Sequence, residues 1–105
     1  MLIISREVNQ SIIIGDDLEL KITKLRGTSA NLLVTRYLIG RRMSEQVFSG
    51  WVERDHSIDL GNEITCALVD VRGNPSTARL GIQAPKEISV HRKEVYEAIR
   101  RTLER

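Results

Sequence analysis

Two arginines, Arg6 and Arg92, each follow an apolar residue by two positions, in segments with the composition of β-strands. Side chains two positions apart on a strand share a face, so we expect Arg6 beside Ile4 and Arg92 beside Val90. The planar guanidinium group can bond a phosphate or a guanine edge at two points, and it can stack on a base. This chemistry is binding rather than catalysis. On spacing alone, two solvated charges at strand ends are the more frequent arrangement.

Residue types that serve catalysis or metal binding do not occur in a usable pattern. Asp55, His56 and Ser57 are adjacent, but a catalytic triad needs converging side chains, and neighbours on a strand point to opposite faces. Cys66, the single cysteine, stands at an apolar strand position and is expected in the core. Two histidines without paired spacing make no zinc site. We therefore expect no enzyme, no cofactor and no metal.

Length and composition indicate one globular domain. The chain has 105 residues, of which 41% are apolar and 29% charged, enough for a core. A net charge of +2 excludes a highly basic tail but leaves room for a local basic patch. A single cysteine, a start without signal-peptide features and apolar runs of at most four residues predict a cytoplasmic protein with no membrane segment.

Two segments resemble each other at an offset of 46 residues, beginning at Ser11 and at Ser57. Five of 17 aligned pairs are identical, and the apolar positions coincide as well, for example Leu18 with Ile64. We predict a single domain over residues 1–105 that contains a weak internal repeat, with copies at 1–36 and 53–105 joined by an unassigned segment, 37–52.

Each copy has the pattern of an antiparallel meander. A short strand ends at a turn pair in which glycine tolerates positive φ: Gly15-Asp16 or Gly61-Asn62. A longer strand follows, with period-two alternation that places the same kind of side chain inward: Leu18, Leu20 and Ile22. The alternation slips near Leu25 and Val71, which predicts a bulge in each copy. Further strands are expected at residues 2–6, 31–36 and 77–83.

The ends of the copies differ, and the C-terminal end carries a predicted helix at about residues 92–104. Its apolar positions have helical spacing and are expected to pack: Val95, Ile99, Thr102 and Leu103. Segment 37–52 could hold a short helix or degraded strands, with Phe48 and Trp51 in the core or an interface. At the repeat offset Gly50 aligns with Ile4, whereas a two-residue gap would bring Arg54 opposite Arg6.

The first six residues, the Ile14-Gly15-Asp16 turn and residues 79–96 resemble the carbon storage regulator (CsrA/RsmA) family. The late block is the specific part, because it contains Ala84-Pro85-Lys86-Glu87, then Val90-His91-Arg92 and Tyr96. The resemblance implies an all-β fold of interleaved antiparallel strands with a C-terminal helix. In the family, two chains of about 60 residues interleave as a dimer, which binds GGA triplets in mRNA leader or small-RNA hairpin loops and controls translation.

The resemblance also implies which residues bind RNA. The family builds each site from the first strand of one subunit and the fifth strand of the other, and it uses main-chain groups just before the fifth strand. Carried over to this chain, the candidate RNA-binding residues are Ile4, Ser5, Arg6, Gln83, Ala84, Pro85, Lys86, Val90, His91 and Arg92. Glu7 departs from the pattern, since many members have a second arginine there and a carboxylate repels phosphate.

This chain is nearly twice as long as the family implies. The first copy has the opening strand without the late block, and the second has the late block with a poor opening strand. One chain could therefore imitate the family dimer and keep the parts of one RNA site. The competing topology is one family fold with a long insertion that forms a homodimer. A different class of function is a protein-interaction module or decoy of this fold that has lost RNA binding, which Glu7 and the half-missing motifs favour.

Overall fold

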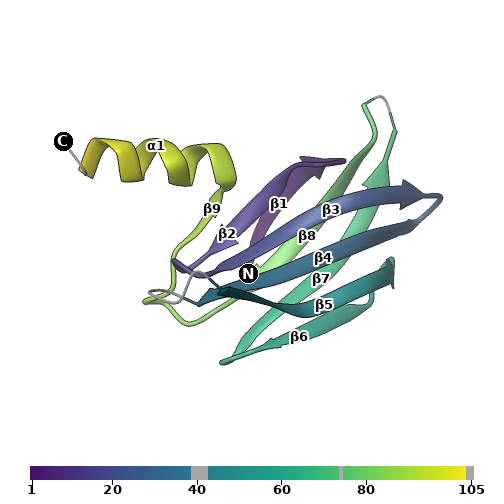
Figure 1. Ribbon diagram of the computed structural model, residues 1–105. Coiled ribbons are helices and arrows are strands. Elements are labelled where there is room, and N and C mark those ends of the chain that lie inside the picture. Colours follow the sequence, from purple (N-terminus) through teal and green to yellow (C-terminus); the bar gives the residue numbers. More distant parts are fainter. Residues whose placement is uncertain (39–42, 74, 104–105) are drawn as a thin grey trace.

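Two antiparallel sheets and one C-terminal helix make up the computed structural model, which describes residues 1–38, 43–73 and 75–103 (Figure 1). This confirms the predicted fold class. The strands are β1 (Leu2–Glu7), β2 (Ser11–Ile14), β3 (Leu18–Arg26), β4 (Ser29–Leu38), β5 (Met43–Glu53), β6 (Ser57–Gly61), β7 (Ile64–Arg72), β8 (Thr77–Gln83) and β9 (Val90–Arg92). The helix is α1 (Lys93–Leu103), and the predicted last residue, Glu104, lies outside the described residues.

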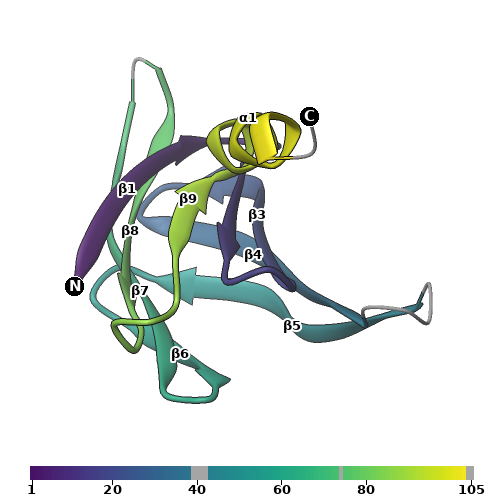
Figure 2. The same ribbon diagram turned by 90° about the vertical axis from the view of Figure 1, so that its left-hand side faces the viewer.

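The sheets interleave the two halves of the chain. One sheet has the order β1-β8-β7-β6 and the other the order β5-β4-β3-β2-β9. The opening strand therefore joins the meander of the second half, and the last strand joins the meander of the first half (Figure 2). Because each sheet needs a strand from the far end of the sequence, neither half completes its sheet alone.

The two meanders repeat each other closely in space. Strands β3 and β7 begin 46 residues apart, and both have a register shift at the same point, after Ile22 and after Leu68. The turns before β2 and β6 repeat as well. The Asn9 N–H donates to the Ile22 carbonyl at 2.6 Å, and the Asp55 N–H donates to the Leu68 carbonyl at 2.8 Å. The predicted bulges are thus present two residues before the positions where the alternation slips. Gly15 and Gly61 have positive φ in the predicted turns.

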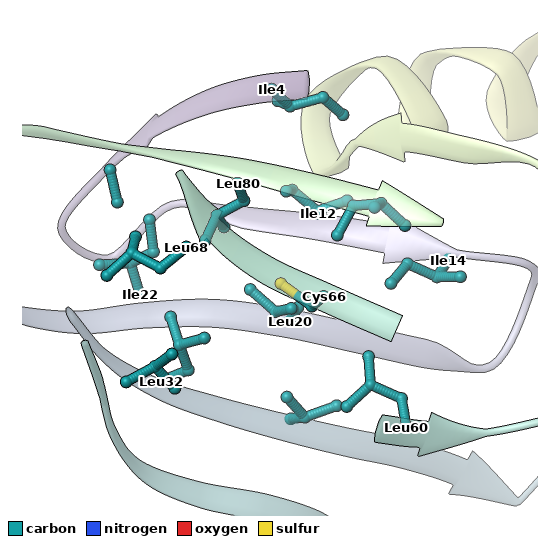
Figure 3. Packing of buried hydrophobic residues seen from close by; sticks show 14 of the residues in the cluster. Ile4, Ile12, Ile14, Leu20, Ile22, Leu32, Leu60, Cys66, Leu68 and Leu80 are labelled. Atoms are coloured by element: carbon teal, nitrogen blue, oxygen red, sulfur yellow. The ribbon is translucent and has the colours of Figure 1, made fainter. Parts of the chain in front are cut away.

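The core lies between the sheets and is built from the predicted alternation (Figure 3). Leu18, Leu20 and Ile22 are fully buried, as are their counterparts Cys66 and Leu68 in the other sheet. Burying one such side chain stabilises the fold by about 1.5–3 kcal/mol. Cys66 is a core residue, and its burial raises the pKa of the thiol to about 12. The thiol therefore stays protonated near neutral pH and is a poor nucleophile.

Segment 37–52, unassigned from the sequence, contains the end of β4 and most of β5, apart from residues 39–42, which lie outside the described residues. Strand β5 pairs with β4 as β1 pairs with β8. Phe48 packs against the core as predicted, but Trp51 is 39% exposed, with the Arg26 guanidinium 4.7 Å from its ring centre.

The pairing of β5 corrects both sequence alignments of the second opening strand. Arg6 lies opposite Ala78 on β8, and Gly50 lies opposite Leu32, which is the residue equivalent to Ala78 on β4. Gly50 therefore takes the place of Arg6, rather than that of Ile4, and Arg54 lies beyond the strand. The connection from Gly50 to Ser57 is two residues longer than the one from Arg6 to Ser11, which shifts the alignment by two positions. The bulge at Val47, where the register shifts between Val34 and Thr35, lies before Gly50 and leaves this pairing unchanged.

Candidate nucleic-acid interface

The edge strands β1 and β9 come together at one open side of the two-sheet structure (Figure 2). A hollow of about 360 Å³ spans the gap where both strands begin. It is lined by Met1, Leu2, Ile82, Gln83, Ala84, Pro85, Lys86, Ile88 and Val90. Five of the ten candidate residues from the sequence line this hollow, which we call the β1–β9 groove.

The loop between β8 and β9 is fixed by two main-chain hydrogen bonds. The Ile88 N–H donates to the Pro85 carbonyl at 3.0 Å and closes a turn, while the Gly15 N–H donates to the Ser89 carbonyl at 2.7 Å. Proline at this position costs no ladder bond, because the chain has already left the sheet after Gln83. Gln83 and Lys86 are exposed on either side of the half-buried Ala84 and Pro85.

Ile4 and Arg6 share a face of β1 as predicted, but that face points inward. Ile4 belongs to the core, and only 5% of Arg6 is exposed. The Arg6 guanidinium donates to both carboxylate oxygens of Glu94, at 2.8 and 2.7 Å, and to the Ser11 carbonyl at 3.0 Å. Ser5 is exposed on the opposite face of β1. Arg6 is a candidate RNA-binding residue from the sequence, but its side chain is turned inward and held there by Glu94, a partner that no sequence pattern indicated.

On β9, Val90 and Arg92 lie opposite Ile14 and Ile12, which are core residues. Cross-strand partners occupy the same face of a sheet, so Val90 and Arg92 line the side of β9 that is turned toward the other sheet. Val90 packs against the core, whereas Arg92 is exposed at the rim. His91 lies opposite Ile13, on the outer face, and is half-buried.

Glu94 connects the two arginines electrostatically. Hydrogen bonding from Arg6 lowers the pKa of Glu94 to about 2, and the positive charge of Arg92 acts in the same direction. The charges of Arg6 and Arg92 therefore both stabilise the same ionised carboxylate. Arg92 is the member of the pair that reaches solvent.

At the equivalent place on the other side of the molecule, the described residues differ from those of the groove. Where β1 sets Leu2 opposite Ile82, β5 sets Glu45 opposite Arg36. Glu45 and Arg36 form an ion pair at 3.6 Å, and Asp17 lies 3.7 Å from the same guanidinium. Within the described ranges, no strand flanks β6 as β9 flanks β2.

Comparison with known proteins shows which family this chain resembles in sequence. A family model described as the global regulator protein family, CsrA, matches residues 1–35 and 53–101. The chain belongs to the CsrA family. A curated relative, the translational regulator CsrA of Rhodopirellula baltica, is 44% identical over 52 residues, which cover 50% of this chain and 71% of the relative. No solved structure matches.

Membership of the CsrA family confirms the resemblance drawn from the late block. The match omits residues 36–52, which contain the end of β4 and all of β5 except Glu53. As a CsrA family member, the chain is an RNA-binding regulator of translation rather than an enzyme. Among the described residues there is no helix long and apolar enough to cross a membrane. The same residues include no cluster of three or more potential metal ligands.

Proposed function

We propose that this CsrA family chain binds GGA-containing RNA hairpins in the β1–β9 groove and thereby controls translation in the cytoplasm. The observation that carries the proposal is that the groove is formed by the two ends of one chain. Met1 and Leu2 lie against the loop that holds Gln83 to Lys86. Single-stranded loops offer RNA-binding proteins unpaired base edges, which main-chain groups and arginines can read.

Each candidate residue receives a role according to its position. Gln83, Ala84, Pro85 and Lys86 would contact the bases with main-chain and polar groups, and the exposed Arg92 would bind a phosphate or a guanine edge. Ser5 and His91, on outer faces, would contribute at the rim. Ile4, Val90 and Arg6 would support the site from within, because their side chains pack inward.

We further propose that one chain imitates the family dimer, with copies at 1–36 and 53–105, and keeps one RNA site. The interleaved strand order, the 46-residue offset of β3 and β7 and the Glu45–Arg36 ion pair at the equivalent place support this. Gly50 in the position of Arg6 leaves that place without its arginine. If the chain were one family fold with a long insertion, β5 would not be expected to pair with β4 in the way that β1 pairs with β8.

A calorimetric titration tests the proposal with a short RNA hairpin that carries GGA in its loop and a matched hairpin with that triplet replaced. We expect tight binding to the GGA hairpin alone, near one RNA per chain, with affinity that falls as salt rises. Two RNAs per chain would contradict the loss of the second site. Equal binding to both hairpins would contradict GGA recognition.

A protein-interaction module or decoy is the second candidate. The burial of Arg6 against Glu94 and the exposure of Glu7 favour it, since both reduce the positive charge that the groove presents to phosphate. This function predicts that neither hairpin binds, while the fold and the groove remain intact.

A further inference from the structure

Helix α1 contacts its own chain through polar side chains. The Lys93 ammonium lies 3.3 Å from a carboxylate oxygen of Glu19, and the Tyr96 hydroxyl lies 3.3 Å from Asp16. Glu94 binds Arg6 as described above. Although burial acts to raise the pKa of Glu19, hydrogen bonds from Ser11 and Tyr37 and the charge of Lys93 lower it, so Glu19 is a charged anchor for the helix.

The apolar side of the same helix is left uncovered, which is the opposite of the packing that the sequence predicts. Val95, Ile99 and Leu103 are 43%, 41% and 75% exposed, and α1 contains no buried residue in its described length. These side chains are exposed because the helix projects away from the sheets (Figure 1). A hollow of about 430 Å³ follows this face and is lined by Glu94, Val95, Ala98, Ile99, Thr102 and Leu103.

We propose that this apolar face pairs with the same face of a second copy of the chain, with the two helices antiparallel. A two-fold axis makes such a contact self-complementary, because each helix gives and receives the same side chains. Ala98 lies midway along the helix on the border of this face, and its small side chain leaves room there for a second helix at the usual axis distance of about 8–10 Å.

The charges beside the face favour this partner and this direction. Glu94 is in the first turn and Arg101 in the last, two helical turns apart, so both lie on the same border of the apolar face. Antiparallel pairing sets Glu94 of each copy near Arg101 of the other, and it also opposes the helix dipoles. Parallel pairing would bring like-charged helix ends together.

The pairing is independent of the proposed RNA function, but it has a consequence for that function. The β1–β9 groove is open at the strand beginnings, whereas the apolar face begins at Glu94 and runs along the helix. A pair of chains would therefore carry two RNA grooves, one per chain. Two short helices bury less than the roughly 1,000 Å² typical of stable complexes, so we expect weak, concentration-dependent dimers.

Sedimentation equilibrium of the full chain over a wide concentration range tests the inference. We expect the mean mass to rise from 11.9 kDa toward twice that value. Ile99→Glu should hold the protein at the single-chain mass, and Arg101→Glu should weaken dimers at least several-fold, while Arg101→Lys retains them. Met43→Glu is the matched control, because Met43 is an exposed apolar residue on β5, and it should dimerise normally.

Circular dichroism of each variant verifies that the fold is intact, and RNA titration at low concentration separates the two proposals. Ile99→Glu should bind RNA with unchanged affinity as a single chain. A single-chain mass of the unaltered protein at every concentration would overturn the inference, as would dimers that survive Ile99→Glu. Absence of RNA binding would overturn only the proposed function.

Discussion

Arg6 and Glu94, 88 residues apart in the chain, form a two-point ion pair that ties the opening strand to the C-terminal helix. The two N–O distances are 2.8 and 2.7 Å, and the pair joins a side chain that is 5% exposed to one that is 61% exposed. The pair bridges the two sheets at the side where β1 and β9 meet. It therefore fixes the end of β1 against the helix that follows β9.

Replacing Glu94 by Gln should destabilise the protein, because Arg6 stays charged and buried with the Ser11 carbonyl as its remaining described partner. We expect a loss of about 1–2 kcal/mol in the free energy of unfolding, less than for a fully buried pair because Glu94 is largely exposed. Urea unfolding measures it. Glu97→Gln on the same helix is the control, with a change within about 0.5 kcal/mol. Equal stabilities of the two variants would show that the pair adds nothing.

The same pair predicts a dependence on pH. The pKa of Glu94 is lowered from 4.5 to about 2, chiefly by the hydrogen bond from Arg6. A lowered pKa means that the stabilisation is complete above the unfolded value of 4.5 and is lost as the pH falls toward 2. The difference in unfolding free energy between the unaltered protein and Glu94→Gln should therefore shrink over this range. A difference that stays constant down to pH 2 would contradict the assignment.

Replacing Arg92 by Ala should weaken binding of the GGA hairpin by about 1–3 kcal/mol, if Arg92 makes a base-specific contact. The side chain is exposed at the rim of β9, so the fold should not change. Arg54→Ala is the matched control, since Arg54 is also exposed but lies in the turn after β5. Calorimetric titration compares the three proteins. If Arg92→Ala binds the GGA hairpin as tightly as the unaltered protein, Arg92 is not part of the site.

Gly81→Ala should alter the groove at little cost in stability. A Cβ at Gly81 would lie 2.6 Å from the sulfur of Met1, which lines the groove and is exposed, so the Met1 side chain must move. We expect a stability change within about 0.5 kcal/mol and a loss of RNA affinity of up to about tenfold. Gly73→Ala, which meets no atom within 4 Å, is the control. If both variants bind RNA like the unaltered protein, Met1 does not shape the site.

The sequence by itself determined the local structure of the repeated meanders. Alternation of Leu18, Leu20 and Ile22, the glycine turns and the slip near Leu25 predicted strands, turns and bulges that the structure contains. These features depend on residues close together in the chain, where period and turn chemistry are decisive. The late block also predicted the family, because its residues are distinctive as a string.

Only the tertiary structure decided which way the shared faces point and what they meet. The alternation put Ile4 and Arg6 together, but their burial depends on β8 and on Glu94, which are more than 70 residues away. Gly50 replaced Arg6 through the register of β5 on β4, which depends on a pairing between two strands. The helix showed its apolar spacing in the sequence, yet its polar contacts to Glu19 and Asp16 turned that face outward. Periodicity assigns residues to a face, whereas long-range pairing and charge decide whether that face is covered.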